Sequence, residues 1–271
     1  MTPAQLTEQI RNKQSFLCVG LDTDIRRIPA CLQGADDPVF EFNKRIIEAT
    51  LPYAIAYKPN IAFYESLGPA GWRSLQKTLE LIPPEVMTIA DAKRGDIGNT
   101  SRLYARTFFE TYQFDAITVA PYMGKDSVAP FLEFEDKWVF LLALTSNPGA
   151  ADFQYHGGSE SNPLFRRVLY AGIEWDREFP GHLGFVAGAT RAETLTEIRY
   201  VAPNAWLLVP GVGEQGGDLG TVIRKGPTSE GGLLINASRS IIYAGSEEDF
   251  DERAAQAARL LQEGMRSYFE M

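Results

Sequence analysis

Residues 86–93 of the chain read Val-Met-Thr-Ile-Ala-Asp-Ala-Lys. The run is apolar or β-branched without interruption up to Ala90, whereas a half-exposed strand alternates apolar and polar residues. An unbroken run of this kind is typical of a parallel β-strand that is covered on both faces. Charged residues appear only at its end, as Asp91 and Lys93. The segment therefore predicts a buried parallel strand whose carboxyl end carries polar side chains.

Seven other stretches of the chain have the same character. They span residues 15–22, 54–61, 116–122, 137–145, 183–190, 205–213 and 232–238. Most of the segments between them carry apolar residues at helical spacing after a helix-initiation signal, such as Asp37-Pro38 or Asn162-Pro163. Eight alternations of strand and helix predict an α/β protein with a (β/α)8 TIM barrel, and a doubly wound open sheet is the competing architecture. Because such barrels typically have about 250 residues, we expect one barrel domain over residues 1–271.

Composition excludes several classes of protein. The chain is 45% hydrophobic and 23% charged, which excludes disordered, collagen-like and coiled-coil proteins. A net charge of −9 argues against binding nucleic acid through a broad basic surface. No apolar run approaches the ~20 residues that span a bilayer, so no membrane association is expected. Two cysteines and no signal-like amino terminus predict a cytoplasmic protein. We expect the tyrosine, phenylalanine and tryptophan residues to lie in the core.

The polar residues of the predicted strands gather at one end. The carboxyl ends carry Asp22, Lys58, Asp91, Lys93, Ser146 and Arg239. In a (β/α)8 barrel the catalytic groups come from the carboxyl ends of the strands and the loops that follow them. The sequence therefore predicts one active site at this end of the barrel.

The densest group of charges is the D-x-K-x-x-D motif of Asp91, Lys93 and Asp96. Residues 91 and 93 are two apart on a strand, so their side chains are expected to face the same way. An ammonium group beside two carboxylates favours their charged forms, and they favour its charged form. Lys58 adds a second cation from an earlier strand end. A structural network of ion pairs is the alternative to a catalytic cluster.

A glycine-rich segment follows the seventh run. Residues 211–216 match G-x-G-x-x-G, but we expect a loop rather than a helix after them, unlike a dinucleotide-binding fingerprint. A phosphate site of the kind that barrels build after strands seven and eight is the better interpretation. Arg239, a forked cation, and the Gln215 amide are the candidate phosphate ligands. The stretch 214–231 is predicted to be a long polar loop, either a lid or a plain surface loop.

Six motifs give the chain a resemblance to a known family. They are Val19-Gly20-Leu21-Asp22, Tyr57-Lys58-Pro59-Asn60, the block from Asp91 to Thr100, the block from Leu144 to Ala150, Val209-Pro210-Gly211-Val212-Gly213, and Ala237-Ser238-Arg239-Ser240-Ile241. Together they resemble the orotidine 5′-phosphate decarboxylase family, in its longer bacterial branch, over nearly the whole chain. The resemblance implies conversion of orotidine 5′-phosphate to uridine 5′-phosphate and CO2. It also implies that no metal and no organic cofactor take part.

The resemblance implies a role for each candidate residue. Lys93 would stabilise the carbanion at C6 and protonate it, Asp91 would lie beside the substrate carboxylate, and Lys58 would orient Asp91 and contact the ribose. Asp22 would hold the ribose hydroxyls, Ser146 would contact the pyrimidine edge, and Gln215 and Arg239 would hold the phosphate. Asp96 and Thr100 would reach into a neighbour's site, which implies a homodimer with two shared sites.

Three other functions stay open at this point. A related barrel enzyme with the same D-x-K-x-x-D motif could act on sugar phosphates with Mg²⁺. A barrel that only binds a nucleotide or sugar phosphate is the second alternative. A Schiff-base aldolase is the third, and it needs a neutral lysine, whereas flanking aspartates favour the ammonium form.

Overall fold

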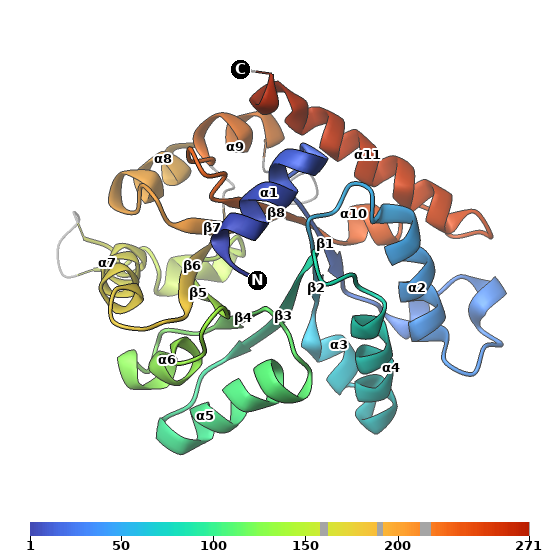
Figure 1. Cartoon of the computed structure of the whole chain (residues 1–271), viewed down its shortest axis with the longest axis horizontal. Helices are drawn as coiled ribbons and strands as arrows, with labels where there is room; N and C mark the ends of the chain where they lie inside the picture. The colour runs from blue at the N-terminus through green and yellow to red at the C-terminus, as the bar shows by residue number, and fades with distance from the viewer. Residues whose placement is uncertain (158–161, 189–191, 212–217, 271) are drawn as a thin grey trace. The chain divides into compact units, whose positions relative to one another are not determined.

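The computed structural model of the protein describes residues 1–157, 162–188, 192–211 and 218–270. Eight strands follow one another in chain order around a closed barrel, which confirms the predicted fold class (Figure 1). The strands are β1 (Leu17–Leu21), β2 (Ala56–Pro59), β3 (Met87–Arg94), β4 (Ala116–Val119), β5 (Trp138–Leu144), β6 (His182–Ala187), β7 (Trp206–Pro210) and β8 (Leu233–Ala237). Each overlaps its predicted run, and only β3 and β6 extend beyond it, by one residue each.

Helices connect the strands. They are α1 (Pro3–Lys13), α2 (Pro38–Thr50), α3 (Ile61–Glu65), α4 (Gly68–Glu80), α5 (Gly98–Arg106), α6 (Lys125–Leu132), α7 (Leu164–Asp176), α8 (Ala192–Val201), α9 (Leu219–Lys225), α10 (Arg239–Ile242) and α11 (Phe250–Phe269). The Asp37-Pro38 signal is used as predicted, whereas α7 begins after Pro163 without a side-chain cap. The Asp37 carboxylate caps α2 by accepting a hydrogen bond from the Phe40 backbone N–H at 3.1 Å, and Pro38 is the first residue of the helix.

The chain divides into two compact parts. The β1–β2 part consists of Pro3–Ala92 and Asn236–Met271, and the β4–β7 part consists of Met1–Thr2 and Lys93–Ile235. The boundaries fall within β3 and β8. The expectation of one domain over residues 1–271 stays a prediction, and the two parts are described separately below.

In the β1–β2 part, the long helices α2 and α11 pack together (Figure 1). The Phe42 ring of α2 stacks on the Phe250 ring of α11, with 5.1 Å between centroids. At the edge of this contact the Arg45 guanidinium donates two hydrogen bonds to the Asp251 carboxylate, at 2.8 and 2.7 Å. Bidentate pairs of this kind fix geometry as well as adding energy. These contacts hold α2 in a defined position against α11.

A buried asparagine on α2 holds the chain that leaves β1. The Asn43 side chain donates hydrogen bonds to the Tyr64 hydroxyl and the Thr78 hydroxyl, both at 3.0 Å. Its carbonyl oxygen accepts one from the Thr23 hydroxyl at 2.6 Å. The Tyr64 hydroxyl in turn donates to the Leu21 carbonyl at 3.2 Å. Because buried polar groups are costly unless they are paired, this network specifies one position for residues 21–23.

The β4–β7 part is built around a layer of aromatic rings. Trp138 on β5 is fully buried, stacks on Phe140 at 6.1 Å and meets the Trp206 ring of β7 edge-on at 5.5 Å. Gly184 on β6 lies beneath these rings, and a Cβ atom there would lie 2.8 Å from Phe140 and from the Trp206 carbonyl. Glycine is therefore required at this position for β5, β6 and β7 to lie together.

Two sequence predictions were wrong in detail. The stretch 214–231 is not simply a loop, because α9 occupies residues 219–225. The Asp218 carboxylate caps this helix by accepting from the backbone N–H groups of Gly220 and Thr221, a signal that the surrounding glycines obscured. The aromatic residues are not all in the core either: Tyr122, Phe153 and Tyr200 are 88, 69 and 83% exposed. Apolar residues are common on protein surfaces, so residue type alone does not decide burial.

Candidate functional site

A buried ion pair joins the ends of two neighbouring strands in the β1–β2 part. Lys58, near the end of β2, donates a hydrogen bond from Nζ to Oδ2 of Asp91 on β3 at 2.7 Å. Only 6% of the Lys58 side chain and 10% of the Asp91 side chain are exposed. Asn60, which follows β2, pairs with Asp91 as an isolated bridge, so the backbones are also held in register. Two of the residues that the sequence singled out are therefore in direct contact.

The pair keeps Lys58 protonated. Burial alone would lower the pKa of Lys58, but the negative charges of Asp91 and Asp22 outweigh burial and raise it above its ordinary value. Cys18 lies on β1 beside the same charges, and burial raises the pKa of its thiol to about 12. The thiol therefore stays protonated and donates weakly to the Asn236 side-chain oxygen at 3.7 Å. Lys58 is the cation of this buried cluster.

Asp22, directly after β1, is the third member of the cluster, and one of its carboxylate oxygens is buried without a hydrogen bond to the described residues. Its Oδ1 atom is buried and makes no hydrogen bond among the described residues, although the carboxylate lies close enough to raise the pKa of Lys58. The Ser238 hydroxyl, after β8, is also buried and without a hydrogen-bond partner in the described part of the chain. Buried polar atoms in proteins are normally paired. Two unpaired atoms at the carboxyl ends of strands therefore indicate a place for a polar ligand.

Gly20 makes room for Ser238. A Cβ atom at residue 20 would lie 1.8 Å from Ser238 Oγ and 3.2 Å from the Asn236 side-chain oxygen. The next residue, Arg239, begins α10 and is exposed. Gln215, the other candidate phosphate ligand, lies outside the described residues. Sequence patterns did not single out Asn236 or Ser238 as polar groups of the site, because both lie within or directly after an apolar strand.

Lys93 has a strained backbone at the end of β3. Its φ angle is +48°, in the left-handed region that β-rich segments avoid, and its N–H donates to the Thr118 hydroxyl of β4 at 2.9 Å. The rule that residues 91 and 93 face the same way assumes a regular pleat, so it does not apply through residue 93. Strain of this kind costs on the order of 1–3 kcal/mol and is concentrated at functional sites.

Asp96 and Thr100 lie on an exposed surface of the β4–β7 part. The Asp96 carboxylate accepts from the Ile97 backbone N–H at 2.8 Å, and Thr100 is exposed on α5. Four large apolar side chains are exposed in the stretches 97–103 and 122–123, namely Ile97 (58%), Leu103 (51%), Tyr122 (88%) and Met123 (45%). A Cβ atom at Gly95 would lie 3.5 Å from the Met123 side chain, so the segments around residues 95 and 123 are adjacent.

Ser146 lies in a loop that is held from two sides. It is half-buried after β5, and the preceding residue, Thr145, exchanges hydrogen bonds with the Gln154 side chain at 2.7 and 2.8 Å. Behind the loop, a Cβ atom at Gly188 would lie 2.6 Å from the Ser146 backbone nitrogen. Gln154 carries no sequence signal, because a glutamine in a loop matches no motif.

A cavity of about 300 Å³ lies beside the chain that leaves β1. It is lined by Thr23, Asp24, Ile25, Arg26, Ala62, Phe63, Ser66 and Leu67, so none of the predicted site residues lines it. Among the described residues, no group of three or more histidine, cysteine or acidic side chains could hold a metal ion. Within the same residues, no helix is both long and apolar enough to cross a bilayer.

The family follows from comparison with known proteins. The model of the orotidine 5′-phosphate decarboxylase / HUMPS family matches residues 15–252. The chain belongs to this family. Orotidine 5′-phosphate decarboxylase of Christiangramia forsetii is 56% identical to it over 100% of the chain and 99% of the relative. The enzyme of the same name from Phocaeicola vulgatus is 53% identical over 98% of both proteins.

Solved structures agree with the family assignment. The structure of Leishmania donovani OMP decarboxylase has a TM-score of 0.79 and 34% identity, and the match covers 97% of this chain and 99% of that one. A crystal structure from Toxoplasma gondii gives a TM-score of 0.88 at 34% identity over 98% of both chains. The resemblance of the sequence to the orotidine 5′-phosphate decarboxylase family is thereby confirmed.

Breaking the buried ion pair should destabilise the protein. A Lys58→Met variant would leave Asp91 and Asp22 buried without their cation, and the free energy of unfolding should fall by about 3–5 kcal/mol. Denaturant unfolding of Lys58→Met and of the Lys58→Met/Asp91→Leu double variant measures this loss. The double variant should recover part of the loss, and a single variant as stable as the unmodified protein would contradict the pair.

Proposed function

We propose that the chain removes CO2 from orotidine 5′-phosphate to give uridine 5′-phosphate, the last step of uridine 5′-phosphate synthesis, without a metal or organic cofactor. The observation that carries this proposal is the full-length similarity to proteins named orotidine 5′-phosphate decarboxylase, at 52–56% identity. The geometry of the β1–β2 part is consistent with it, because Asp22, Lys58 and Asp91 form a charged cluster with an unpaired carboxylate oxygen.

The chemical problem of this reaction is charge. When the bond between C6 and the carboxylate breaks, its electron pair stays on C6 in the plane of the ring, where no conjugated group accepts it. A fixed positive charge in a site that excludes water stabilises such a carbanion. We assign this role to Lys93, whose ammonium group then donates a proton to C6 and is reprotonated from solvent. Asp91 would repel the substrate carboxylate, and that repulsion ends as CO2 leaves.

The other residues would bind and orient the substrate. Lys58 holds Asp91 in place through the 2.7 Å pair and would also contact the ribose. Asp22 would accept hydrogen bonds from the ribose hydroxyls, and Ser146 would contact the pyrimidine edge. Arg239 and Gln215 would hold the phosphate. Binding energy from the phosphate, which is remote from C6, can organise the charged groups for the reaction.

A homodimer is part of the proposal. Asp96 and Thr100 would reach into the site of a second copy, as the family resemblance implies. The exposed apolar side chains of the stretches 97–103 and 122–123 support this role, because they are of the kind that interfaces bury. Nucleic acid and membranes are not expected partners, and a cytoplasmic location stays a prediction.

The alternative functions are weaker. The family model also covers HUMPS proteins, so an enzyme that acts on sugar phosphates is the second candidate. The names of the relatives at 52–56% identity favour the nucleotide enzyme. A Schiff-base mechanism through Lys58 is disfavoured, because the neighbouring carboxylates raise the pKa of Lys58 and a Schiff base needs the neutral amine.

The purified chain should consume orotidine 5′-phosphate in an ultraviolet assay, with loss of the orotate absorbance. EDTA should leave the rate unchanged, because the proposed chemistry uses no metal ion. A chain that is inactive on this nucleotide, or active only with Mg²⁺ on a sugar phosphate, would refute the proposed function.

Replacement of Lys93 by alanine should abolish turnover, because both the cation and the proton donor are lost. The variant should keep its fold and its affinity for uridine 5′-phosphate, since neither the barrel nor the phosphate ligands are changed. Circular dichroism and calorimetric titration check these controls. Near-normal turnover by Lys93→Ala would remove Lys93 from the mechanism.

The proposed shared sites of the dimer can be tested by mixing two inactive variants. Lys93→Ala and Asp96→Ala chains should each be inactive alone. When they are mixed and allowed to exchange subunits, half of the dimers contain one chain of each kind and one intact site, so about a quarter of the original activity should return. Equal mixing without any recovery would show that each chain uses its own Asp96.

A further inference from the structure

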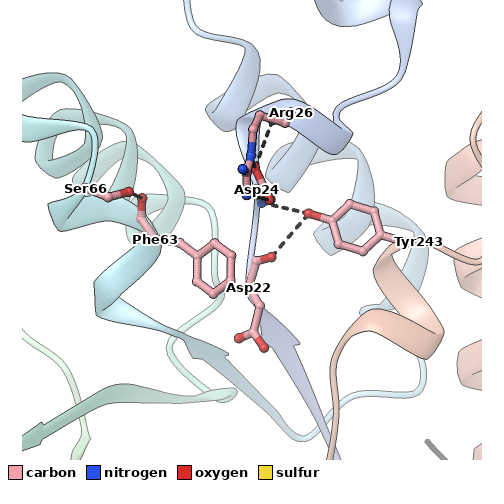
Figure 2. Close-up of polar contacts among 6 residues, drawn as sticks. All are labelled: Asp22, Asp24, Arg26, Phe63, Ser66 and Tyr243. Carbon is pink, nitrogen blue, oxygen red and sulfur yellow. Dashed lines mark hydrogen bonds and ion pairs between the residues drawn. The ribbon is translucent and has the colours of Figure 1, made fainter.

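The segment that leaves β1 is held by a tyrosine from the other end of the chain. The Tyr243 hydroxyl donates a hydrogen bond to the Asp22 carbonyl oxygen at 3.2 Å and accepts one from the Asp24 N–H at 2.7 Å (Figure 2). One hydroxyl thus connects the two peptide groups on either side of Thr23. Both residues belong to the β1–β2 part.

The carboxylates of the two aspartates in this segment differ in their hydrogen bonds. The Asp24 carboxylate accepts hydrogen bonds from the Arg26 backbone and guanidinium at 2.7–3.0 Å, and these bonds with Arg26 lower its pKa to about 2. The Asp22 carboxylate instead points away from Tyr243, and its buried Oδ1 makes no hydrogen bond to any described residue (Figure 2). Asp22 is therefore the aspartate whose carboxylate is left for a ligand, and Tyr243 holds its main chain.

The Tyr243 ring is itself fixed. The Arg27 guanidinium carbon lies 3.7 Å from its centroid, and the Phe42 ring stacks on it at 5.7 Å. Burial raises the pKa of the Tyr243 phenol, so the hydroxyl remains a donor at neutral pH. Tyr243 is the residue that ends α10, and its N–H donates to the Arg239 carbonyl at 3.2 Å. One four-residue helix therefore connects the proposed phosphate ligand to the segment that carries Asp22.

We propose that Tyr243 is a positioning residue that holds Asp22 in the orientation in which its carboxylate binds the ribose hydroxyls of the nucleotide. This inference rests on the proposed function for the identity of the ligand. Thr23 is anchored separately by Asn43, so loss of the Tyr243 hydroxyl leaves the segment in place but frees the Asp22 and Asp24 peptide groups. The effect is expected on the direction of the Asp22 carboxylate rather than on the fold.

A pair of nucleotides tests this role. Calorimetric titration compares uridine 5′-phosphate with 2′,3′-dideoxyuridine 5′-phosphate, which lacks both ribose hydroxyls. Tyr243→Phe should lower the affinity for uridine 5′-phosphate roughly tenfold, the size expected for a misplaced hydrogen-bonding group. The affinity for the dideoxy nucleotide should stay within about twofold of that of the unmodified chain. The KM for orotidine 5′-phosphate should rise while kcat changes less. Tyr53→Phe, a half-buried tyrosine before β2, is the matched control and should change neither affinity.

If Tyr243 had a purely structural role, Tyr243→Phe would lower both affinities together or only the unfolding temperature, and either result would overturn the inference. Unchanged affinity of Tyr243→Phe for uridine 5′-phosphate would overturn it as well. If Tyr243→Phe fails to fold, Arg27→Ala removes only the contact to the ring. It should also lower the affinity for uridine 5′-phosphate selectively, but by less. An unmodified chain that binds neither nucleotide would instead contradict the proposed function, so the two failures are distinguishable.

Discussion

The buried contact between Lys58 and Asp91 is the interaction on which the charged cluster of the β1–β2 part depends. Taking an ammonium group and a carboxylate out of water costs several kcal/mol for each, and only close contact with further charges compensates for it. The Asp22 carboxylate supplies the additional negative charge that keeps Lys58 protonated. Cys18 and Asn236, which contact each other, are neutral neighbours of the cluster. These contacts fix the Lys58 and Asp91 side chains before a ligand binds, so little reorganisation is needed on binding.

Side chains from three helical segments hold the exit from β1 by hydrogen bonds. Tyr64, Asn43 and Tyr243 reach it from α3, α2 and the end of α10, and each fixes a different residue of the segment. Catalytic and binding groups must be held within a fraction of an ångström, and rigid elements do this better than loops. The arrangement explains how a residue just beyond a strand can be as precisely placed as one within it.

Much of this architecture was predictable from local patterns. Unbroken apolar runs located all eight strands, and helix-initiation signals such as Asp37-Pro38 located helix starts, because burial and capping act over a few residues. Their strand-end positions placed Lys58 and Asp91 at one end of the barrel, and the family resemblance implied that Lys58 orients Asp91. What sequence could not predict were groups brought in from far along the chain. Tyr243 is 221 residues from Asp22 and matched only the expectation of a core aromatic residue. The strained φ angle of Lys93 and the helix capped by Asp218 were likewise invisible to the strand and glycine patterns around them.

The close approach of Gly20 and Ser238 has a consequence for how the family can vary. Since a side chain at residue 20 would occupy the space of the Ser238 hydroxyl, residue 20 cannot change first. A substitution at residue 20 would be tolerated only in a background where residue 238 is already smaller. The order in which substitutions arise therefore matters at this pair of positions.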